Sequence, residues 1–573
     1  MTTPVATQEF KPSPIAEAPF SAASAAPLVR HLRQILLWPL RLIADPKNAD
    51  AALRPWQMLH DLPDSPWSEV HDEFSADGAK FEERHYNEFV TFLPYVQRFL
   101  YGEGRDTQAA SPDALGSPMR VFRRHDVAQF RVQARPGDPV VLLNVQHIDL
   151  YFFFAVDLVF LNVEVSANDL TLPHAQELMY RLGRGYPAGW DAKGSPLHCL
   201  HSVELLDKNG LVLASSDAHD RKAFMQHVSQ HRTPRITSHW AYLLKPLVSD
   251  HSVEAGPLRF RQIEYYRMPM MAYLGLDDPR ALTRSDFIRL GLVTGANPED
   301  RSNDSALPYS EDHLADFERR FCYDRFWTRG GSAPNTRYLC SGHSLIVVGA
   351  TDSTFYSCSE RGVLAHFRHQ HFLLFLIAHF QKAALLMYSD RLVEALKQLS
   401  IGDANSVRAF KRAIRASFES FLGFTHRYWF HEVAEQAQAR ALFHMCANHL
   451  GLDPLYAEVK ARMADMNTYL DTDSIRRQAN TVVRLTVVTI FGLIGTVTTG
   501  FLGMNLLAEA DAPWPQRLAI FATVFGLTTL LTVYTMVKSR RLSDFLDNLS
   551  DDKLSAWQKT KSFFAVWGKE RGD

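Results

Sequence analysis

The chain has 573 residues, of which 46% are hydrophobic, and a formal net charge of −2. This length allows two or more domains, so that a large soluble core and a smaller membrane part can coexist. The near-neutral charge and the lack of a long basic run exclude a global field for nucleic acid, and no nucleic-acid partner is expected. Five scattered cysteines without a CxxC pair are typical of reduced thiols on the cytoplasmic side.

The first segments of the chain are interpreted from their composition. Residues 1–27 carry Pro and Glu where a signal peptide needs an apolar core, which predicts a disordered N-terminal tail. The following run, LVRHLRQILLWPLRLI, is both basic and apolar. It is interpreted as a packed strand or helix of the next domain, with a helix on a membrane surface as the alternative.

Residues 28–361 are predicted to form a cytoplasmic domain of α/β or α+β type. Helical signals such as LPHAQELMYRLG lie between runs that favour strands. A hairpin is expected in VELLDKNGLVLAS, with its turn at Asn209-Gly210. The strand-like runs are PVVLLNVQHIDLYFFFAVDLVFLNVEV, YLLKPLV and HSLIVVGA.

Residues 362–484 are predicted to be a cytoplasmic helical and stalk region. Its run HFLLFLIAHFQKAALLMY is apolar, but His379, Gln381 and Lys382 would be costly in lipid, which favours a buried helix over a membrane span. Further on, Asp453-Pro454 is a helix-start signal, and neither Gly nor Pro follows until after Phe491. We therefore expect one continuous helix of about 50 residues, ~75 Å long, that runs from the stalk into the membrane.

Two segments near the C-terminus carry a membrane signal. Residues 485–505 are predicted to be the first transmembrane helix, because the chain has no charge from Leu485 to Ala508 and about 24 residues give ~36 Å of helix against a hydrocarbon core of ~30 Å. Residues 518–537 supply about 20 more uncharged positions, enough for a second span. Between them lies a periplasmic loop, residues 506–517.

The charges beside these spans predict their orientation. The positive-inside rule places both termini in the cytoplasm, the basic tail of residues 538–573 included, and the short acidic loop outside. The basic flanking residues are Arg476, Arg477, Arg484, Lys538, Arg540 and Arg541. The protein is therefore predicted to be a multi-pass protein of the inner membrane.

Gly503-Met504-Asn505 closes the first span, directly before the short acidic loop and a final second span. This arrangement resembles the CorA family of divalent metal cation (magnesium) transporters, whose signature is that tripeptide in that place. The resemblance implies a CorA-like fold: an α+β cytoplasmic domain, a long-helix stalk and two C-terminal transmembrane helices. It also implies a homopentamer in membrane lipid that acts as a channel for Mg²⁺, with Co²⁺ or Ni²⁺ as further cargo.

The tripeptide is the predicted ion-selectivity filter, with Asn505 as the residue that meets the metal. Mg²⁺ prefers oxygen ligands and gives up its water reluctantly, so neutral oxygens can hold the hydrated ion. A ring of Asn505 amides with backbone carbonyls near Gly503 would supply them, and Gly permits a close approach of the backbone. Mg²⁺ is expected as the transported ion, without a resident cofactor.

The first span also presents a candidate pore wall. Leu485, Thr489, Leu493, Thr496 and Gly500 recur at spacings of three and four, hence on one helical face. This face is apolar in the middle and small or hydroxylated toward its outer end, as a pore wall with a constriction would be. The alternative is that Thr and Gly allow close helix packing in lipid. The resemblance matches Thr496 and Gly500 with pore-lining positions of the family.

Three further features flank this wall. Asn480 resembles an inner-mouth Asn of the family, with one residue of spacing missing. Glu509 and Asp511 are predicted to concentrate cations at the outer mouth, although a polar loop that needs solubility is the alternative. Leu502 stands where the family has an aromatic residue, a departure that concerns the outer packing of the filter.

Other functions receive less support from the sequence. No P-loop, dinucleotide fingerprint or GxSxG elbow is found, so an enzyme is not expected. Three groups of histidines and one cysteine lack a full ligand set at structural-zinc spacing and are interpreted as packed or surface residues: His198 and His201; His366, His369 and His371; and His444, Cys446 and His449. Two alternatives to a magnesium channel remain, a zinc or other transition-metal transporter of the same superfamily and a membrane-tethered sensor or scaffold with a vestigial pore.

Overall fold

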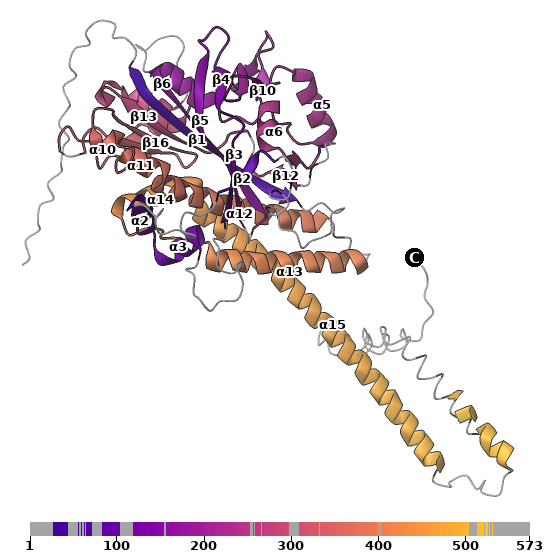
Figure 1. Cartoon of the computed structure of the whole chain (residues 1–573). Coiled ribbons are helices and arrows are strands. Elements are labelled where there is room, and N and C mark those ends of the chain that lie inside the picture. The colour runs from indigo at the N-terminus through magenta and orange to yellow at the C-terminus, as the bar shows by residue number, and fades with distance from the viewer. Residues whose placement is uncertain are drawn as a thin grey trace, which may run out of the picture. The chain divides into compact units, whose positions relative to one another are not determined.

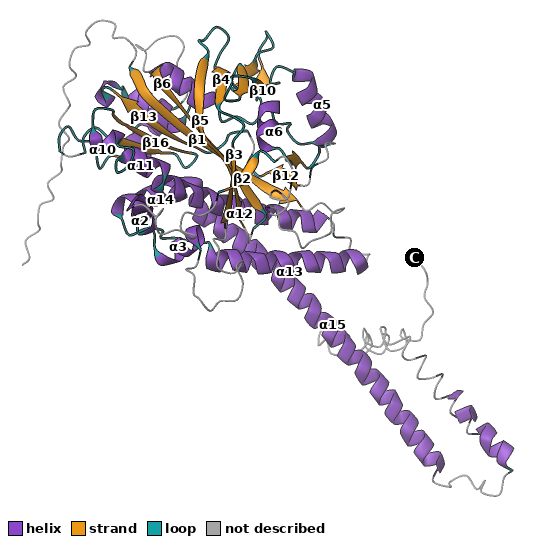
Figure 2. Cartoon of the chain, viewed as in Figure 1, coloured by secondary structure: helices purple, strands orange, loops and turns teal. Residues whose placement is uncertain are grey.

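We analysed a computed structural model of the whole chain. It describes residues 27–43, 83–102, 119–252, 258–296, 309–397 and 404–503, apart from a few positions within these ranges, and scattered positions elsewhere between 56 and 534. The chain divides into two compact units, Met1–Lys460 and Ala461–Asp573. The first contains all the strands and most of the helices among the described residues (Figure 2).

Fourteen strands of the first unit form one sheet, and two short strands, β7 and β8, pair separately. The strands are β1 (Leu28–Ile43), β2 (Trp67–Glu69), β3 (Met119–Arg124), β4 (Gln129–Gln133), β5 (Val141–Phe153), β6 (Leu158–Thr171), β7 (Gly189–Trp190), β8 (Pro196–Leu197), β9 (Ser202–Leu206), β10 (Val212–Ser215), β11 (Leu247–Ser249), β12 (Leu258–Gln262), β13 (Met270–Leu276), β14 (Cys322–Tyr323), β15 (Arg337–Cys340) and β16 (Ser344–Ala350).

The central strand of the sheet is β1, the basic and apolar run near the N-terminus, so the prediction of a packed element is confirmed (Figure 1). On one side it pairs antiparallel with β6 along nearly its whole length. Its other side is shared, because β13 pairs with the first half and β12 with the last four residues. The main path of the sheet is β10-β9-β4-β5-β6-β1-β13-β16-β15-β14, and the only parallel pairs among the described strands are β13 with β16 and β11 with β12.

Apolar side chains of β1 alternate between the two faces of the sheet, and this explains why both faces are covered by other parts of the protein. Leu32, Leu36 and Trp38 point into a hydrophobic core that also contains residues of α4, α6 and α7. Ile35 and Leu37, between them, are buried on the opposite face, where α12 contacts β1. A strand with apolar residues on both faces is expected in a sheet with helices on both sides.

The helices complete these layers (Figure 1). They are α2 (Glu83–Phe89), α3 (Pro94–Tyr101), α4 (Leu172–Arg181), α5 (Arg221–His231), α6 (Ser238–Leu244), α7 (Arg284–Leu292), α8 (Glu311–Leu314), α9 (Phe317–Phe321), α10 (Thr354–Ser357), α11 (Val363–Arg368), α12 (Gln370–Lys397), α13 (Ala404–Arg427), α14 (Ala437–Leu450) and α15 (Leu452–Gly503). From Val363 onward every described element is a helix, as the sequence predicts.

Two local predictions can be compared with these elements. The hairpin at Asn209-Gly210 is confirmed, since β9 and β10 pair antiparallel and Gly210 has a φ of 82°, which favours glycine. The strand expected over YLLKPLV is wrong in its first half. Residues 242–244 end helix α6, and only after Pro246, which cannot continue a helix, does strand β11 begin.

Helix α12 contains the apolar run that the sequence assigns to a buried helix, and this prediction is confirmed. Among the described residues, Val363–Lys397 is the one stretch long and apolar enough to cross a membrane, but 78% of its apolar window is buried inside the protein. Gln381 is buried there and donates to the carbonyl oxygens of Tyr428 and Phe430, 3.1 and 3.2 Å away. Hydrogen bonds of this kind offset the cost of burying an amide.

Helix α15 is continuous for 52 residues, as predicted from the absence of Gly and Pro between Leu455 and Phe491. It follows Gly451, which ends α14 in a left-handed conformation with a φ of 65°. Pro454 lies in its first turn, where a missing N–H costs little. The helix continues into the second unit and contains a short apolar stretch, Thr481–Ile490. The described positions between 514 and 534 are also helical.

Candidate ion pathway and polar sites

Several predicted pore-lining residues lie on α15. Leu485, Thr489 and Thr496 follow one another at helical spacing, and Gly500 and Gly503 continue the same row to the end of the helix. Asn480 and Leu493 also belong to this helix, but their side chains lie outside the described part of the chain. The structure therefore places the row on one helical face, as the spacing predicts.

The hydroxyl groups of this row are held by the helix itself. Thr489 Oγ1 donates to the carbonyl oxygen of Leu485 at 2.8 Å, and Thr496 Oγ1 donates to that of Gly492 at 2.9 Å. Each hydroxyl has one proton, which this bond uses, so its lone pairs remain as acceptors. A row of acceptors suits a hydrated cation, because the water around a cation points its hydrogens outward.

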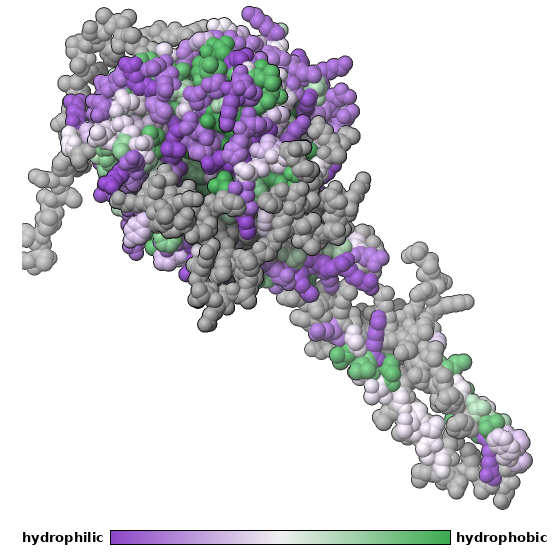
Figure 3. Space-filling view, in the orientation of Figure 1, coloured by the Kyte–Doolittle hydropathy of each residue, from purple (hydrophilic) through white to green (hydrophobic). Residues whose placement is uncertain are grey.

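Large apolar side chains of the second unit are exposed within the single chain. Leu485 is 67% exposed and Ile490 51%, and in the second predicted span Leu527 and Leu530 are 69% and 72% exposed. Figure 3 shows the described residues of this part of the chain mostly in white and green. A Cβ added at Gly500 would meet no atom within 4 Å. Exposed apolar side chains that lie together are typical of surfaces that contact lipid or other protein chains.

The predicted filter and outer mouth lie outside the described residues. This applies to Met504, Asn505, Glu509 and Asp511, whereas Gly503 is the last described residue of α15. Half of residues 518–537 also lie outside. The roles assigned to these residues therefore stay predictions.

A second polar site, which we call the sheet cluster, lies on the face of the sheet beneath α11. Its members are Glu88, Arg33, Arg123, His147, Asp149, Asn162, Glu164, Arg368 and His369. Glu164 on β6 is its centre, with its carboxylate 3.3 Å from Arg33 Nε, 3.7 Å from Arg368 Nε and 3.9 Å from His147 Nε2. Beside it, Arg123 holds Asp149 through two hydrogen bonds of 2.8 and 3.2 Å.

The charges of the sheet cluster balance. Its three arginines face three carboxylates, with Glu88 lying 3.3 Å from His369. Burial raises the pKa of Glu164, and the cations of Arg33 and Arg368 oppose this shift. Burial, and then the charge of Arg123, lower the pKa of His147 to about 3. A buried network without net charge has no preference for a free ion, so we assign it to the fold.

Sequence reasoning missed this cluster, although a local signal was present. Asn162, Glu164 and Ser166 alternate along β6 in the run NVEVSAND, and a period of two places all three on one face of the sheet. His147 and Asp149 alternate in the same way on β5. Polar residues at alternate positions of an otherwise apolar strand indicate either a buried polar row or a solvated face. Here helices cover this face of the sheet, so the polar row is buried.

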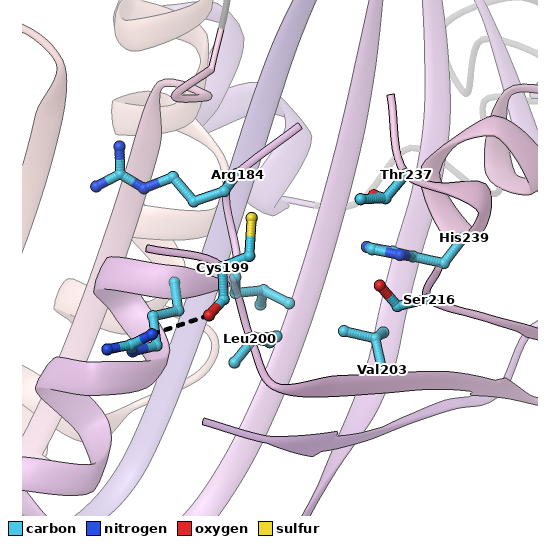
Figure 4. Close-up of a pocket in the computed structure, with 9 residues that line it drawn as sticks. Arg184, Cys199, Leu200, Val203, Ser216, Thr237 and His239 are labelled. Carbon is cyan, nitrogen blue, oxygen red and sulfur yellow. Dashed lines mark hydrogen bonds between the residues drawn. The ribbon is translucent and has the colours of Figure 1, made fainter. Parts of the chain in front are cut away.

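A small cavity lies between Cys199 and the residues Ser216, Thr237 and His239 (Figure 4). Its volume of about 10 Å³ leaves room for at most one water. His239 is buried, and its Nδ1 has no hydrogen-bond partner among the described residues. Burial lowers the pKa of this ring to about 3, so it is neutral at physiological pH. The cavity can hold a bridging water but no larger ligand.

The histidines considered as metal ligands have other contacts. His366 hydrogen-bonds to Gln370, His449 Nε2 donates to the carbonyl oxygen of Arg320 at 2.8 Å, and His444 lies 3.3 Å from Glu432. His198 hydrogen-bonds to Tyr180. In the described part of the chain, no three His, Cys, Asp or Glu side chains are already arranged to hold a metal ion.

No protein-family model, curated protein or solved structure matches this chain. The functional interpretation therefore depends on its own residues and geometry. The features that the proposal below uses are the face of α15, the exposed apolar side chains and the tripeptide at the end of the first predicted span.

Proposed function

We propose that the chain is a subunit of a CorA-like, homo-oligomeric channel that carries Mg²⁺ across the inner membrane into the cytoplasm. Several copies would surround one axis, because two spans from one chain enclose no pore, and the resemblance implies that their number is five. Co²⁺ and Ni²⁺ are the further cargo that the resemblance implies.

The observation that carries this proposal is the row of oxygens and small residues on α15. Thr489 and Thr496 present oxygen lone pairs, and Gly500 and Gly503 leave space at the end of the same face. Hydroxyl oxygens can accept hydrogen bonds from the water shell of Mg²⁺ without removing it, which matches the reluctance of this ion to dehydrate. Several copies of the row around an axis would form a hydrated wall.

The exposed apolar residues support the membrane location. Leu485, Ile490, Leu527 and Leu530 would each be costly in water if they remained as exposed as they are in the single chain. Side chains that do not face the axis would meet lipid or neighbouring helices. A soluble monomer gives no reason for this surface, whereas a membrane oligomer does.

The mass of the oligomer and the flux of Mg²⁺ test the proposal together. Purified protein in detergent is expected to be five times the mass of one chain, and the same preparation in liposomes should let Mg²⁺ enter down its gradient. A monomer, or an oligomer without flux of any divalent cation, would contradict it. Zn²⁺ entry that Mg²⁺ does not compete with would favour the zinc transporter instead.

A further inference from the structure

Three histidines gather at the end of helix α5, outside every site described above. His227 and His231 are four residues apart on this helix, and His251 follows strand β11. The ring centres of His227 and His231 are 4.6 Å apart, and those of His231 and His251 are 5.4 Å apart. All three side chains are partly exposed, so solutes can reach them.

We propose that His227, His231 and His251 bind a divalent transition metal ion such as Zn²⁺, Ni²⁺ or Co²⁺. Two histidines at i and i+4 project from the same face of a helix, and this pairing is a common half of a zinc site. The third ligand comes from a different part of the fold, as it does in many such sites. The inference concerns the first unit alone and does not depend on the proposed transport function.

The spacing of the rings fits this use. A metal lies ~2.1 Å from each imidazole nitrogen, which places two ring centres roughly 4.5 to 5 Å apart when the ligands stand at right or tetrahedral angles. The two observed separations lie close to this range. The rings are not yet aimed at one point, since His231 and His251 stack with 25° between their planes. Binding therefore requires the rings to turn about their Cβ–Cγ bonds, which partly exposed side chains can do.

The surroundings favour a cation at this position. His231 is the last residue of α5, where unpaired carbonyl groups give the helix end a partial negative charge. Asp250 Oδ2 lies 3.5 Å from His251 Nε2. A carboxylate beside a ligating imidazole fixes the ring and leaves the other nitrogen free for the metal, an arrangement typical of zinc sites.

Two of the arginines near the triad are paired with carboxylates, and a third, Arg259, donates to the carbonyl oxygen of Ser252 at 3.1 Å. Arg261 Nε donates to Asp250 at 2.9 Å, and Arg235 forms an ion pair with Asp217 at 2.6 Å.

The ligand set also defines the class of ion. Imidazole nitrogens suit Zn²⁺, Ni²⁺, Co²⁺ and Cu²⁺, whereas Mg²⁺ prefers oxygen ligands. The site should thus not bind Mg²⁺ at concentrations that saturate the proposed channel. It would make the first unit responsive to a class of metal different from the main cargo.

Titration of the full-length protein in detergent tests the inference. After treatment with a chelator, the wild type is titrated with ZnCl₂ by isothermal titration calorimetry, beside the variants His227→Gln and His251→Gln. Each variant is expected to bind Zn²⁺ about 10- to 100-fold more weakly, the loss typical of a disrupted metal environment. Addition of MgCl₂ should not displace Zn²⁺ from the wild type.

Two controls separate this site from others. His444→Gln removes another partly exposed histidine that lies beside a carboxylate, and it should bind Zn²⁺ like the wild type. His426→Gln removes an exposed histidine of α13 and should also keep the site. Thermal melts without metal establish that each variant is folded, and His231→Asn replaces any variant that is not. Equal binding of Zn²⁺ by the wild type and both triad variants, or no saturable binding at all, would overturn the proposal.

Discussion

Thr489 and Leu485 are joined by a hydrogen bond within α15: Oγ1 of Thr489 donates to the carbonyl oxygen of Leu485, 2.8 Å away and one turn earlier. This bond uses the only proton of the hydroxyl and fixes the position of its oxygen. The lone pairs that remain can only accept hydrogen bonds. Thr489 can therefore accept hydrogen bonds from the water around a cation, but it has no free proton to donate to an anion.

Removal of this oxygen should slow transport without unfolding the helix. Thr489→Val keeps the shape of the side chain, and Val and Thr have similar helix propensities. The loss of one net hydrogen bond, worth about 0.5–1.5 kcal/mol, corresponds to a reduction of Mg²⁺ flux by roughly two- to tenfold. Thr489→Ser, which keeps the oxygen, should retain wild-type flux. Equal flux through the Val and Ser variants in liposomes would remove Thr489 from the wall.

Replacement of Gly500 by Ala should stabilise the helix in the single chain but impair Mg²⁺ transport by the assembly. A Cβ at this position meets no atom within 4 Å in one chain, and Ala is favoured over Gly in a helix by about 1 kcal/mol. Gly500→Ala should therefore raise the helix content in detergent, measured by circular dichroism. It should nevertheless lower Mg²⁺ flux, because several added methyl groups narrow the outer end of the wall. Unchanged flux would place Gly500 away from the axis.

The sheet cluster makes a prediction about stability. Glu164 is buried between Arg33 and Arg368, so Glu164→Gln leaves two arginines without their counter-charge. Loss of one member of a buried ion pair costs about 3–5 kcal/mol in the free energy of unfolding. Glu204→Gln is the matched control, because Glu204 pairs with Arg131 on the same sheet, with both side chains more than a third exposed, and exposed pairs contribute about 0–1 kcal/mol. Chemical denaturation of both variants measures the difference, and equal losses would contradict a central role for Glu164.

Buried neutral histidines should make the first unit sensitive to acid. Burial lowers the pKa of His239, His371 and His379 to about 3, from 6.5 in the unfolded chain. Below pH 6.5 these rings bind protons in the unfolded chain but not in the folded one. Their full contribution to the free energy of unfolding is therefore present above pH 6.5, and it is lost as the pH drops toward 3. Each ring contributes a slope of about 1.4 kcal/mol per pH unit in this window.

Denaturation midpoints between pH 7 and 5 check this slope. His379 Nε2 donates to the carbonyl oxygen of Gly342 at 3.0 Å, a bond that the amide of His379→Gln can replace. This variant should lose less stability per pH unit than the wild type. His426→Gln, at an exposed position on α13, is the control and should keep the wild-type slope. A wild-type stability that is flat from pH 7 to 5 would contradict the account of these rings.

Local patterns predicted much of the fold. The hairpin at Asn209-Gly210, the buried helix around Gln381 and the uninterrupted helix after Pro454 each depend on neighbours in the sequence, and all three are found. The helical end of YLLKPLV was missed because Leu243 and Leu244 are apolar in either structure, and apolarity alone does not separate a short strand from a short helix.

Features that need distant partners were not predictable in the same way. The place of β1 at the centre of the sheet depends on strands more than 100 residues away. Likewise, the HVSQH spacing of His227 and His231 is visible in the sequence, but His251 joins them only through the fold. The filter differs from both cases, because Asn505 was inferred from a motif and lies outside the described residues.

Asn505 carries the central claim, and one measurement tests it most directly. Mg²⁺ entry is followed in liposomes that contain equal amounts of wild type, Asn505→Ala or the control Asn448→Ala, which removes an exposed amide from α14. The account predicts Mg²⁺ entry with the wild type and the control and its loss with Asn505→Ala, while all three proteins keep the same oligomeric mass. Mg²⁺ entry through Asn505→Ala at the wild-type rate would contradict the assignment of the filter.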